Sequence, residues 1–165
     1  MRWLIDGYNV IRRDPELVAG EAAGLDAGRA ALLALLARVA RDSRETFTVV
    51  FDGARRTGGT PSPGRVAVMF SRPPDTADDV LRRLAASLRD GAVVVTSDRA
   101  VLDSARRVGA VAVTAEAFLD AARRPPDDDV GDDDDEPPPT KRGPRRRPSR
   151  EARDVARVLR KLRPR

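Results

Sequence analysis

The chain of 165 residues contains no cysteine and no histidine, and only six of its residues are aromatic. Without cysteine, neither a disulfide framework nor a thiolate zinc site can form. The two lysines, Lys141 and Lys161, both lie near the C-terminus. Residues 1–124 therefore lack the side chains of Ser/His triads, Cys/His nucleophiles, Schiff-base enzymes and lysine-containing phosphate loops. Chemistry in this region has to use carboxylates, hydroxyls, amides and arginines.

Long apolar runs are also missing. No stretch approaches the length of a membrane span, and the first residues carry an acid, Asp6, and no long apolar signal segment. A chain of this length has room for one substantial core. We therefore expect a soluble, cytoplasmic protein that makes no membrane contact.

Charge is distributed unevenly. Residues 1–124 hold 19 arginines and 16 acids, residues 127–136 hold eight acids and no base, and residues 141–165 hold twelve bases and two acids. Runs of like charge repel themselves and bury little apolar surface. We therefore predict a domain over 1–124, a disordered acidic and proline-rich linker over 125–148, and a basic tail segment over 149–165.

The basic tail segment has the pattern of a short amphipathic helix, with apolar residues at helical spacing and cations around them. The apolar stripe consists of Ala152, Val155, Ala156, Leu159 and Leu162. A helix this short is marginal alone, so we expect it to form against a partner. RNA is the simplest partner, and a solvated extension is the alternative.

Short β-branched runs alternate with helical patterns across residues 1–124. The expected strands are RWLI, TFTVVF, RVAVMF, AVVVTS and AVAV, and helical spacing occurs over 26–42, 76–90, 99–109 and 115–124. This alternation predicts an α/β fold with a mainly parallel sheet covered on both faces. The Gly- and Pro-rich link 53–64 is too short for a helix, so the second and third strands could be an exception.

Acidic residues gather at the edge where parallel strands end, which is where α/β sheets place their functional groups. Asp6, Asp52 and Asp98 end the first, second and fourth strands, and Asp78 and Asp79 begin the helix after the third. Carboxylates crowded there must take up protons or bind a cation. With oxygen ligands only, that cation would be Mg²⁺ or Mn²⁺.

Each of these acids also has a purely structural interpretation. Thr76 and Asp79 match a helix cap with an acid at the third helical position, and we favour the cap for Asp79. Ser97 or Asp98 could cap the next helix, and Asp52 could belong to a turn. Capping fits the first-strand acid least, because no helix start is evident after it.

An oxygen-bound Mg²⁺ activates water and stabilises the charge of phosphodiester attack, so the acids favour a nuclease. Asp6 would be a ligand, Gly7 would let the backbone turn beside it, and the Asn9 amide could hold a ligand water or a phosphate. A phosphatase with an aspartyl nucleophile is the competitor. It would normally need a second Asp two residues on and a lysine, whereas position 8 is Tyr8 and residues 1–124 have no lysine.

Four separated motifs occur in order: LIDGYNVI, VVFDG, DTADDVL and VVVTSDR, followed by a Gly-containing turn and EAF. Over roughly residues 2–122 they resemble the YacP-like branch of the NYN domains, which are related to PIN nucleases. The resemblance implies a PIN-like three-layer α/β/α sandwich, an acidic pocket for Mg²⁺ or Mn²⁺, and endonucleolytic cleavage of single-stranded RNA. Characterised relatives include endoribonucleases that act on messenger RNA at the ribosome, so the ribosome is an implied partner.

Matched residue by residue, the resemblance assigns catalysis and metal binding to Asp6, Asp78 and Asp98. The polar supporting positions are Asn9, Thr96 and Ser97. The family often has a Glu one turn after the T-A-D signature, whereas Arg82 and Arg83 occupy that region here. The fourth ligand is therefore open, and Asp79 or Asp52 could replace it.

Arginines in or beside loops could follow an RNA backbone. The candidates are Arg12, Arg13, Arg55, Arg56 and Arg72, with Arg65 as a further one. A solvated surface is the alternative for each. Only Tyr8 and Phe70 offer aromatic rings near this edge, so we do not expect sequence-specific readout. The competing function is a non-catalytic RNA-binding adaptor whose pocket is too depleted to hold metal.

Overall fold

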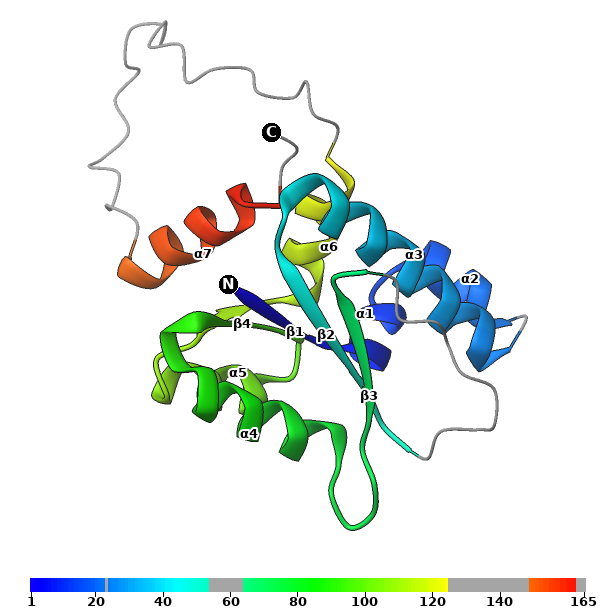
Figure 1. Ribbon diagram of the computed structural model, residues 1–165, viewed down its shortest axis with the longest axis horizontal. Helices are drawn as coiled ribbons and strands as arrows, with labels where there is room; N and C mark the ends of the chain where they lie inside the picture. The colour runs from blue at the N-terminus through cyan, green and yellow to red at the C-terminus, as the bar shows by residue number, and fades with distance from the viewer. Residues whose placement is uncertain (23, 54–63, 125–148, 163–165) are drawn as a thin grey trace, which may run out of the picture.

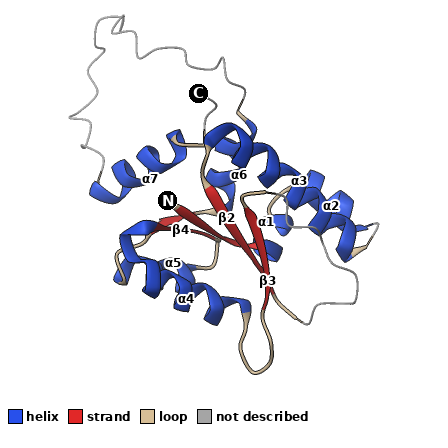
Figure 2. Ribbon diagram, in the orientation of Figure 1, coloured by secondary structure: helices blue, strands red, loops and turns tan. Residues whose placement is uncertain are grey.

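The computed structural model describes residues 1–22, 24–53, 64–124 and 149–162. Its elements are β1 (Arg2–Asp6), α1 (Gly7–Arg12), α2 (Pro15–Ala22), α3 (Leu25–Ser43), β2 (Thr46–Phe51), β3 (Val66–Phe70), α4 (Ala77–Leu88), the 3₁₀ turn η1 (Arg89–Gly91), β4 (Ala92–Val95), α5 (Arg99–Arg107), β5 (Val111–Val113), α6 (Ala115–Arg123) and α7 (Arg150–Arg160). All five predicted strands are present, and the four helical patterns of residues 1–124 form α3, α4, α5 and α6 (Figure 2).

The five strands form one parallel sheet in the order β3-β2-β1-β4-β5 (Figure 1). The chain builds outward from β1 to β3 and then crosses to β4 on the other side of β1. The carboxyl ends of β1 and β4 therefore meet where the strand order reverses, the usual position of a ligand site in such sheets. The β2 and β3 pair is parallel as well, with Phe47 opposite Val66.

Helices cover both faces of the sheet, which confirms the predicted three-layer sandwich. Along β1 the side chains alternate between faces. Trp3 and Ile5 pack in a core with α1, α2, α3 and α6, whereas Leu4 packs in a second core with α4 and α5. The Trp3 ring lies 6.0 Å from the Phe47 ring and 5.8 Å from the Phe118 ring, so the larger core is built around aromatic contacts.

Two helices precede α3 that the sequence patterns did not indicate. The expectation that no helix starts after Asp6 is wrong: α1 begins at Gly7, and the Asp6 carboxylate caps it by accepting a hydrogen bond from the Asn9 amide. The next helix, α2, has Pro15 in its first turn, where a missing N–H costs nothing. Both helices are short, so neither gives the long periodic pattern from which helices are recognised.

The C-terminal segment forms the predicted helix, α7, and its partner within the structure is the domain itself. Val158 and Leu162 are buried in the core shared with α6, and Val155 and Leu159 pack against that core. Figure 1 shows α7 beside α6. The buried face is shifted from the predicted stripe: Ala152 and Ala156 are exposed. A helix of eleven residues is marginal alone, and this apolar contact stabilises it.

Two further expectations concern residues that are not described. The predicted linker, residues 125–148, lies outside the described residues, as do Arg55 and Arg56. Within the described part of the chain, no helix is both long and apolar enough to cross a membrane.

Candidate active site

A cavity of about 370 Å³ opens at the carboxyl edge of the sheet, where β1, β2 and β4 end. It is lined by Asp6, Tyr8, Asn9, Arg12, Asp52, Thr76, Ala77, Asp78 and Asp98. Four of these residues are acids, and they come from segments up to 92 positions apart in the chain. The structure thus brings together the three predicted catalytic carboxylates, and we call this cavity the acidic pocket.

Asp6 is held in place by two neighbours. It is only 9% exposed. One carboxylate oxygen accepts a hydrogen bond from the backbone N–H of Asn9 at 3.3 Å, and the other accepts one from the Thr96 hydroxyl at 2.9 Å. The carboxylate therefore combines two roles, because it caps α1 and faces the acidic pocket.

Thr96 and Asn9 join the loops that follow β1 and β4. The fully buried Thr96 hydroxyl donates to Asp6 and accepts from the Asp98 amide at 3.2 Å. The Asn9 side-chain oxygen accepts from the Ser97 amide at 2.8 Å. Both residues are among the predicted supporting positions. They fix the spacing of the two loops that carry Asp6 and Asp98.

Asp98 is the N-cap of α5, with one oxygen accepting from the Val101 amide at 3.1 Å. Of the two candidate caps for this helix, Asp98 and not Ser97 forms the bond. The residue is exposed and lines the acidic pocket. It can use its second oxygen in the pocket, because the cap occupies only one.

Asp78 and Asp79 are separated by the start of α4. Asp78 lines the acidic pocket, and Arg82 lies 3.5 Å from its carboxylate. Asp79 forms the predicted capping box with Thr76, accepting from its amide at 3.0 Å and from its hydroxyl at 2.8 Å. The other oxygen of Asp79 lies 3.4 Å from Arg82. Both oxygens of Asp79 are therefore engaged, and this residue does not line the pocket.

Asp52 ties the end of β2 to the elements beside it. Its carboxylate accepts from the Ser71 hydroxyl at 2.6 Å and from the Ala77 amide at 3.3 Å. Ser71 follows β3, and Ala77 begins α4. Asp52 thus lines the acidic pocket and also positions the helix that carries Asp78.

Ser97 and Glu116 form a contact that sequence reasoning missed. The Ser97 hydroxyl donates to the Glu116 carboxylate at 2.7 Å, and this bond lowers the pKa of Glu116. The other oxygen of Glu116 lies 3.4 Å from Arg13. The sequence shows the EAF motif that contains Glu116, but its partner Ser97 is 19 positions upstream, so the contact cannot be recognised without the fold. Glu116 connects α6 to the loop that carries Asp98.

Two acids of the pocket, Asp6 and Asp78, have raised pKa values. Burial is the main cause of the raised pKa of Asp6, and the charges of Asp78 and Asp98 add to it against the hydrogen bonds from Thr96 and Asn9. Burial also raises the pKa of Asp78, partly opposed by the positive charge of Arg82. Binding a cation would relieve this repulsion.

The donor set suits a hard cation. Carboxylate oxygens are the protein ligands that Mg²⁺ and Mn²⁺ take, and Mg²⁺ commonly binds through one or two carboxylates and several waters. Among the described residues no group of three or more acidic side chains has the arrangement of a preformed metal site. The acidic pocket therefore fits an ion held by one or two carboxylates and by water.

The described arginine candidates occupy different surroundings. Arg12 lines the acidic pocket, Arg13 pairs with Glu116, and Arg72 is exposed after β3. Arg65 precedes β3 and so lies at the opposite, amino edge of the sheet, away from the pocket. Of these four arginines, Arg12 is the one that lines the acidic pocket.

The structural role of Asp79 as a cap and the proposed role of Asp78 as a metal ligand can be tested separately at the start of α4. Asp79→Ala removes the carboxylate of the capping box, so it should lower the free energy of unfolding and leave RNA cleavage intact. Asp78→Asn should change stability little and abolish cleavage. Denaturant unfolding and a cleavage assay on both variants measure the two effects. The reverse pattern would show that the roles are exchanged.

The raised pKa of Asp6 predicts a pH-dependent stability difference. The ordinary pKa of Asp6 is 3.8, and its pKa in the folded state is higher. At pH values between these two, the folded protein binds the Asp6 proton more tightly than the unfolded chain does. The contribution of Asp6 to stability therefore falls as the pH rises through this window. Asp6→Asn removes the charge and keeps a capping oxygen. We expect this variant to melt above the parent at pH 7 in EDTA.

The difference in Tm should disappear below pH 3.8, where Asp6 is protonated in both states. Asp79 and Glu116 have lowered pKa values and act in the opposite sense, so each pH needs the parent as its reference. A variant that melts below the parent at pH 7 would contradict the raised pKa of Asp6.

The parallel sheet and the acidic pocket at its carboxyl edge agree with the PIN-like fold that the sequence motifs implied. The model of the family described as "YacP-like NYN domain" matches residues 3–152, and the chain belongs to that family. The match extends past residue 122 and reaches the first residues of α7.

Two solved structures are similar to this chain. Rae1 (YacP) from Bacillus subtilis has a TM-score of 0.65 and 28% identity, covering 74% of this chain and 73% of that one. A mutant form of the same Bacillus subtilis protein has a TM-score of 0.63 and 27% identity, covering 74% of both chains. No curated protein matches this chain.

Proposed function

We propose that this protein is a metal-dependent endoribonuclease that hydrolyses phosphodiester bonds of single-stranded RNA in the acidic pocket. One observation carries the proposal: Asp6, Asp78 and Asp98 line one cavity where the strand order reverses, in a chain of the YacP-like NYN family. Residues 1–124 contain no histidine, cysteine or lysine that would supply another chemistry.

Asp6, Asp78 and Asp98 would hold Mg²⁺ or Mn²⁺, one or two of them directly and the rest through water bound to the ion. The ion would activate water and stabilise the charge that develops on the phosphate. Thr96 and Asn9 position the loops that carry Asp6 and Asp98 through the hydrogen bonds described above. In this proposal Asp79 serves as a cap and Asp52 as a support for α4, so neither is needed as a fourth ligand.

Arg12 would bind the RNA backbone beside the reacting phosphate, because it lines the same cavity as the acids. Tyr8 also lines the cavity and offers one ring on which a base can stack. A pocket with a single aromatic ring favours cleavage with little sequence preference. Messenger RNA at the ribosome, in the cytoplasm, is the setting that the family resemblance suggests.

The direct test incubates the full chain with an end-labelled, unstructured RNA in Mn²⁺, in Mg²⁺ and in EDTA. We expect internal cuts with either metal and none in EDTA, and no cuts in an otherwise identical DNA. Tight RNA binding without cleavage in either metal would favour the alternative function, a non-catalytic RNA-binding adaptor.

A further inference from the structure

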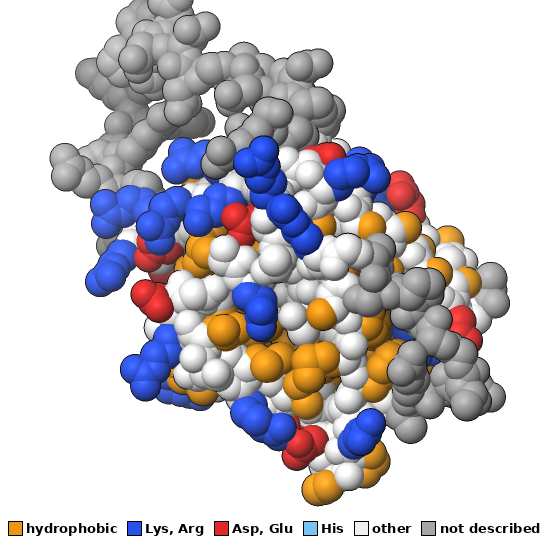
Figure 3. Space-filling view, in the orientation of Figure 1, with side chains coloured by type: hydrophobic (Ala, Val, Ile, Leu, Met, Phe, Trp, Pro, Cys, Tyr) orange, Lys and Arg blue, Asp and Glu red, His pale blue; other side chains and the backbone are white. Residues whose placement is uncertain are grey.

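The outward face of α7 carries a continuous basic stripe. Its members are Arg150, Arg153, Arg157, Arg160 and Lys161. All five are exposed, and at 100° per residue they lie on the sides of the helix turned away from the buried Val158 and Leu162. Figure 3 shows Lys and Arg side chains gathered over this part of the surface. The helix therefore faces the core with one side and presents cations with the others.

Acids of the described residues neutralise little of this stripe. Arg157 lies 3.2 Å from Asp154. Within the described part of the chain, the other four cations of the stripe form no ion pair. The remaining acid of α7, Glu151, pairs with Arg106 of α5 and not with the stripe. Four of the five positive charges thus have no acidic partner among the described residues.

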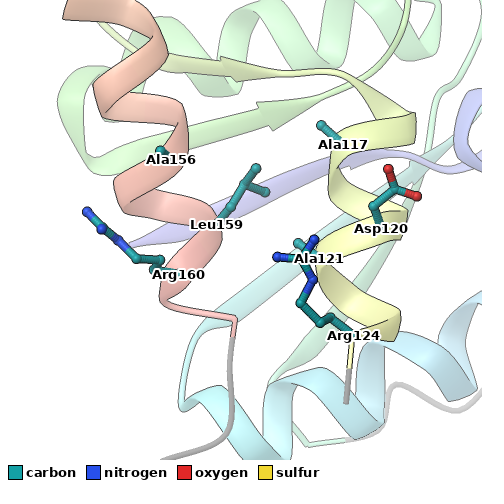
Figure 4. A pocket seen from close by; sticks show the side chains of 7 residues that line it. All are labelled: Ala117, Asp120, Ala121, Arg124, Ala156, Leu159 and Arg160. Atoms are coloured by element: carbon teal, nitrogen blue, oxygen red, sulfur yellow. The ribbon is translucent and has the colours of Figure 1, made fainter. Parts of the chain in front are cut away.

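A groove beside the stripe extends the basic surface toward α6. This cavity of about 410 Å³ is lined by Ala117, Asp120, Ala121, Arg124, Ala156, Leu159 and Arg160. The small side chains of both helices leave it hollow, and Figure 4 shows Arg124 in the gap between α6 and α7. Arg124 therefore adds a cation from a second element.

The basic stripe is separate from the acidic pocket. The first turn of α7 lines a cavity together with Gly109 and Ala110, which precede β5 at the amino edge of the sheet. The acidic pocket lies at the carboxyl edge, and none of the residues that line it belongs to α6 or α7. An anion on the stripe would thus not occupy the site of cleavage.

We propose that the basic stripe of α7 is a second RNA contact, which binds backbone phosphates of the RNA while the acidic pocket acts on another part of the chain. The cations span about 16 Å along the helix at 1.5 Å per residue, enough for several phosphates. No aromatic residue belongs to the stripe, so the contact reads charge and not bases. RNA as the polymer rests on the proposed function.

Two matched double variants of the full chain test this proposal. Arg153→Gln with Arg157→Gln removes one unpaired and one paired cation from the stripe. The control, Arg83→Gln with Arg89→Gln, also removes one paired and one unpaired cation, from α4 and from η1. Arg83 pairs with Asp75 at 2.5 Å. Glutamine retains helix propensity, so α7 should stay folded, and matching Tm values verify this. Binding of a fluorescent RNA of about 30 nucleotides is titrated in EDTA from about 50 to 300 mM salt, the range over which phosphate contacts are most salt-sensitive.

The stripe variant should bind about 20-fold more weakly than the parent at about 0.1 M salt, and its slope of log K against log salt should be shallower by about 1.4, because each single-strand phosphate contact contributes about 0.7. The control pair should bind like the parent. Equal binding by the stripe variant and the parent, or an equal loss in the control pair, would overturn the proposal.

Cleavage separates this proposal from the proposed function. A short RNA that occupies the acidic pocket alone does not touch the stripe, so the stripe variant should cut it at the parent rate. If the parent cuts no RNA but the stripe variant still loses binding, the catalytic proposal fails and the α7 contact stands.

Discussion

Asp6→Asn and Asp98→Asn should each reduce RNA cleavage by at least about 100-fold. Loss of a group that merely positions a metal ligand costs about 10- to 100-fold, so loss of the ligand itself should cost more. Asparagine keeps the shape and one oxygen of each side chain, so the caps of α1 and α5 persist. The loss would therefore report on the negative charge in the acidic pocket and not on folding.

Single-turnover cleavage of an end-labelled RNA at saturating Mn²⁺ measures this effect. Asp90→Asn is the matched control, because Asp90 is an exposed acid in η1, outside the acidic pocket. Its rate should equal that of the parent. If Asp6→Asn or Asp98→Asn cleaves at the parent rate, the assignment of the acidic pocket is wrong.

The strands and the acids at their ends were predictable because both signals are local. A β-branched run ending in Asp marks a buried parallel strand whose last residue reaches the carboxyl edge, and Asp6, Asp52 and Asp98 all lie at that edge. The capping box is equally local, because Thr76 and Asp79 are only three positions apart in the chain. Such signals need no knowledge of the rest of the fold.

The features that were missed depend on tertiary contacts. The helix α1 is too short to show a repeating pattern of apolar residues, so its start after Asp6 could not be predicted from the sequence. The buried face of α7 includes Val158, which lies outside the predicted stripe, because β5 and α6 and not the helix alone decide which side is covered. The pair of Ser97 and Glu116 likewise joins a loop and the helix α6, which only the sheet brings together.

Gly7 shows the same difference between local and tertiary causes. The sequence suggested that this glycine lets the backbone turn beside Asp6. In the structure it is the first residue of α1 and does not have a positive φ. Its constraint is the Phe51 ring: a Cβ at Gly7 would lie 2.3 Å from one ring carbon and 2.4 Å from another.

Gly7→Ala should therefore lower the free energy of unfolding by about 3 kcal/mol, the upper part of the usual range for overpacking. Phe51 is fully buried, with the Tyr8 ring 5.1 Å away and the Phe70 ring 5.7 Å away, so it cannot move aside without disturbing both. The α1 start would have to shift instead, and Asp6 would shift with it. Cleavage should fall together with stability.

Gly20→Ala is the matched control for this change, and denaturant unfolding of both variants provides the measurement. Gly20 lies in α2, and the nearest atoms to its added Cβ are 3.8 Å away, an ordinary contact distance. Alanine should stabilise that helix by about 0.5–1 kcal/mol. Opposite signs for the two variants would show that the contact with Phe51, and not the loss of glycine itself, determines the effect. If Gly7→Ala unfolds at the same denaturant concentration as the parent, the ring can yield and Asp6 does not depend on this contact.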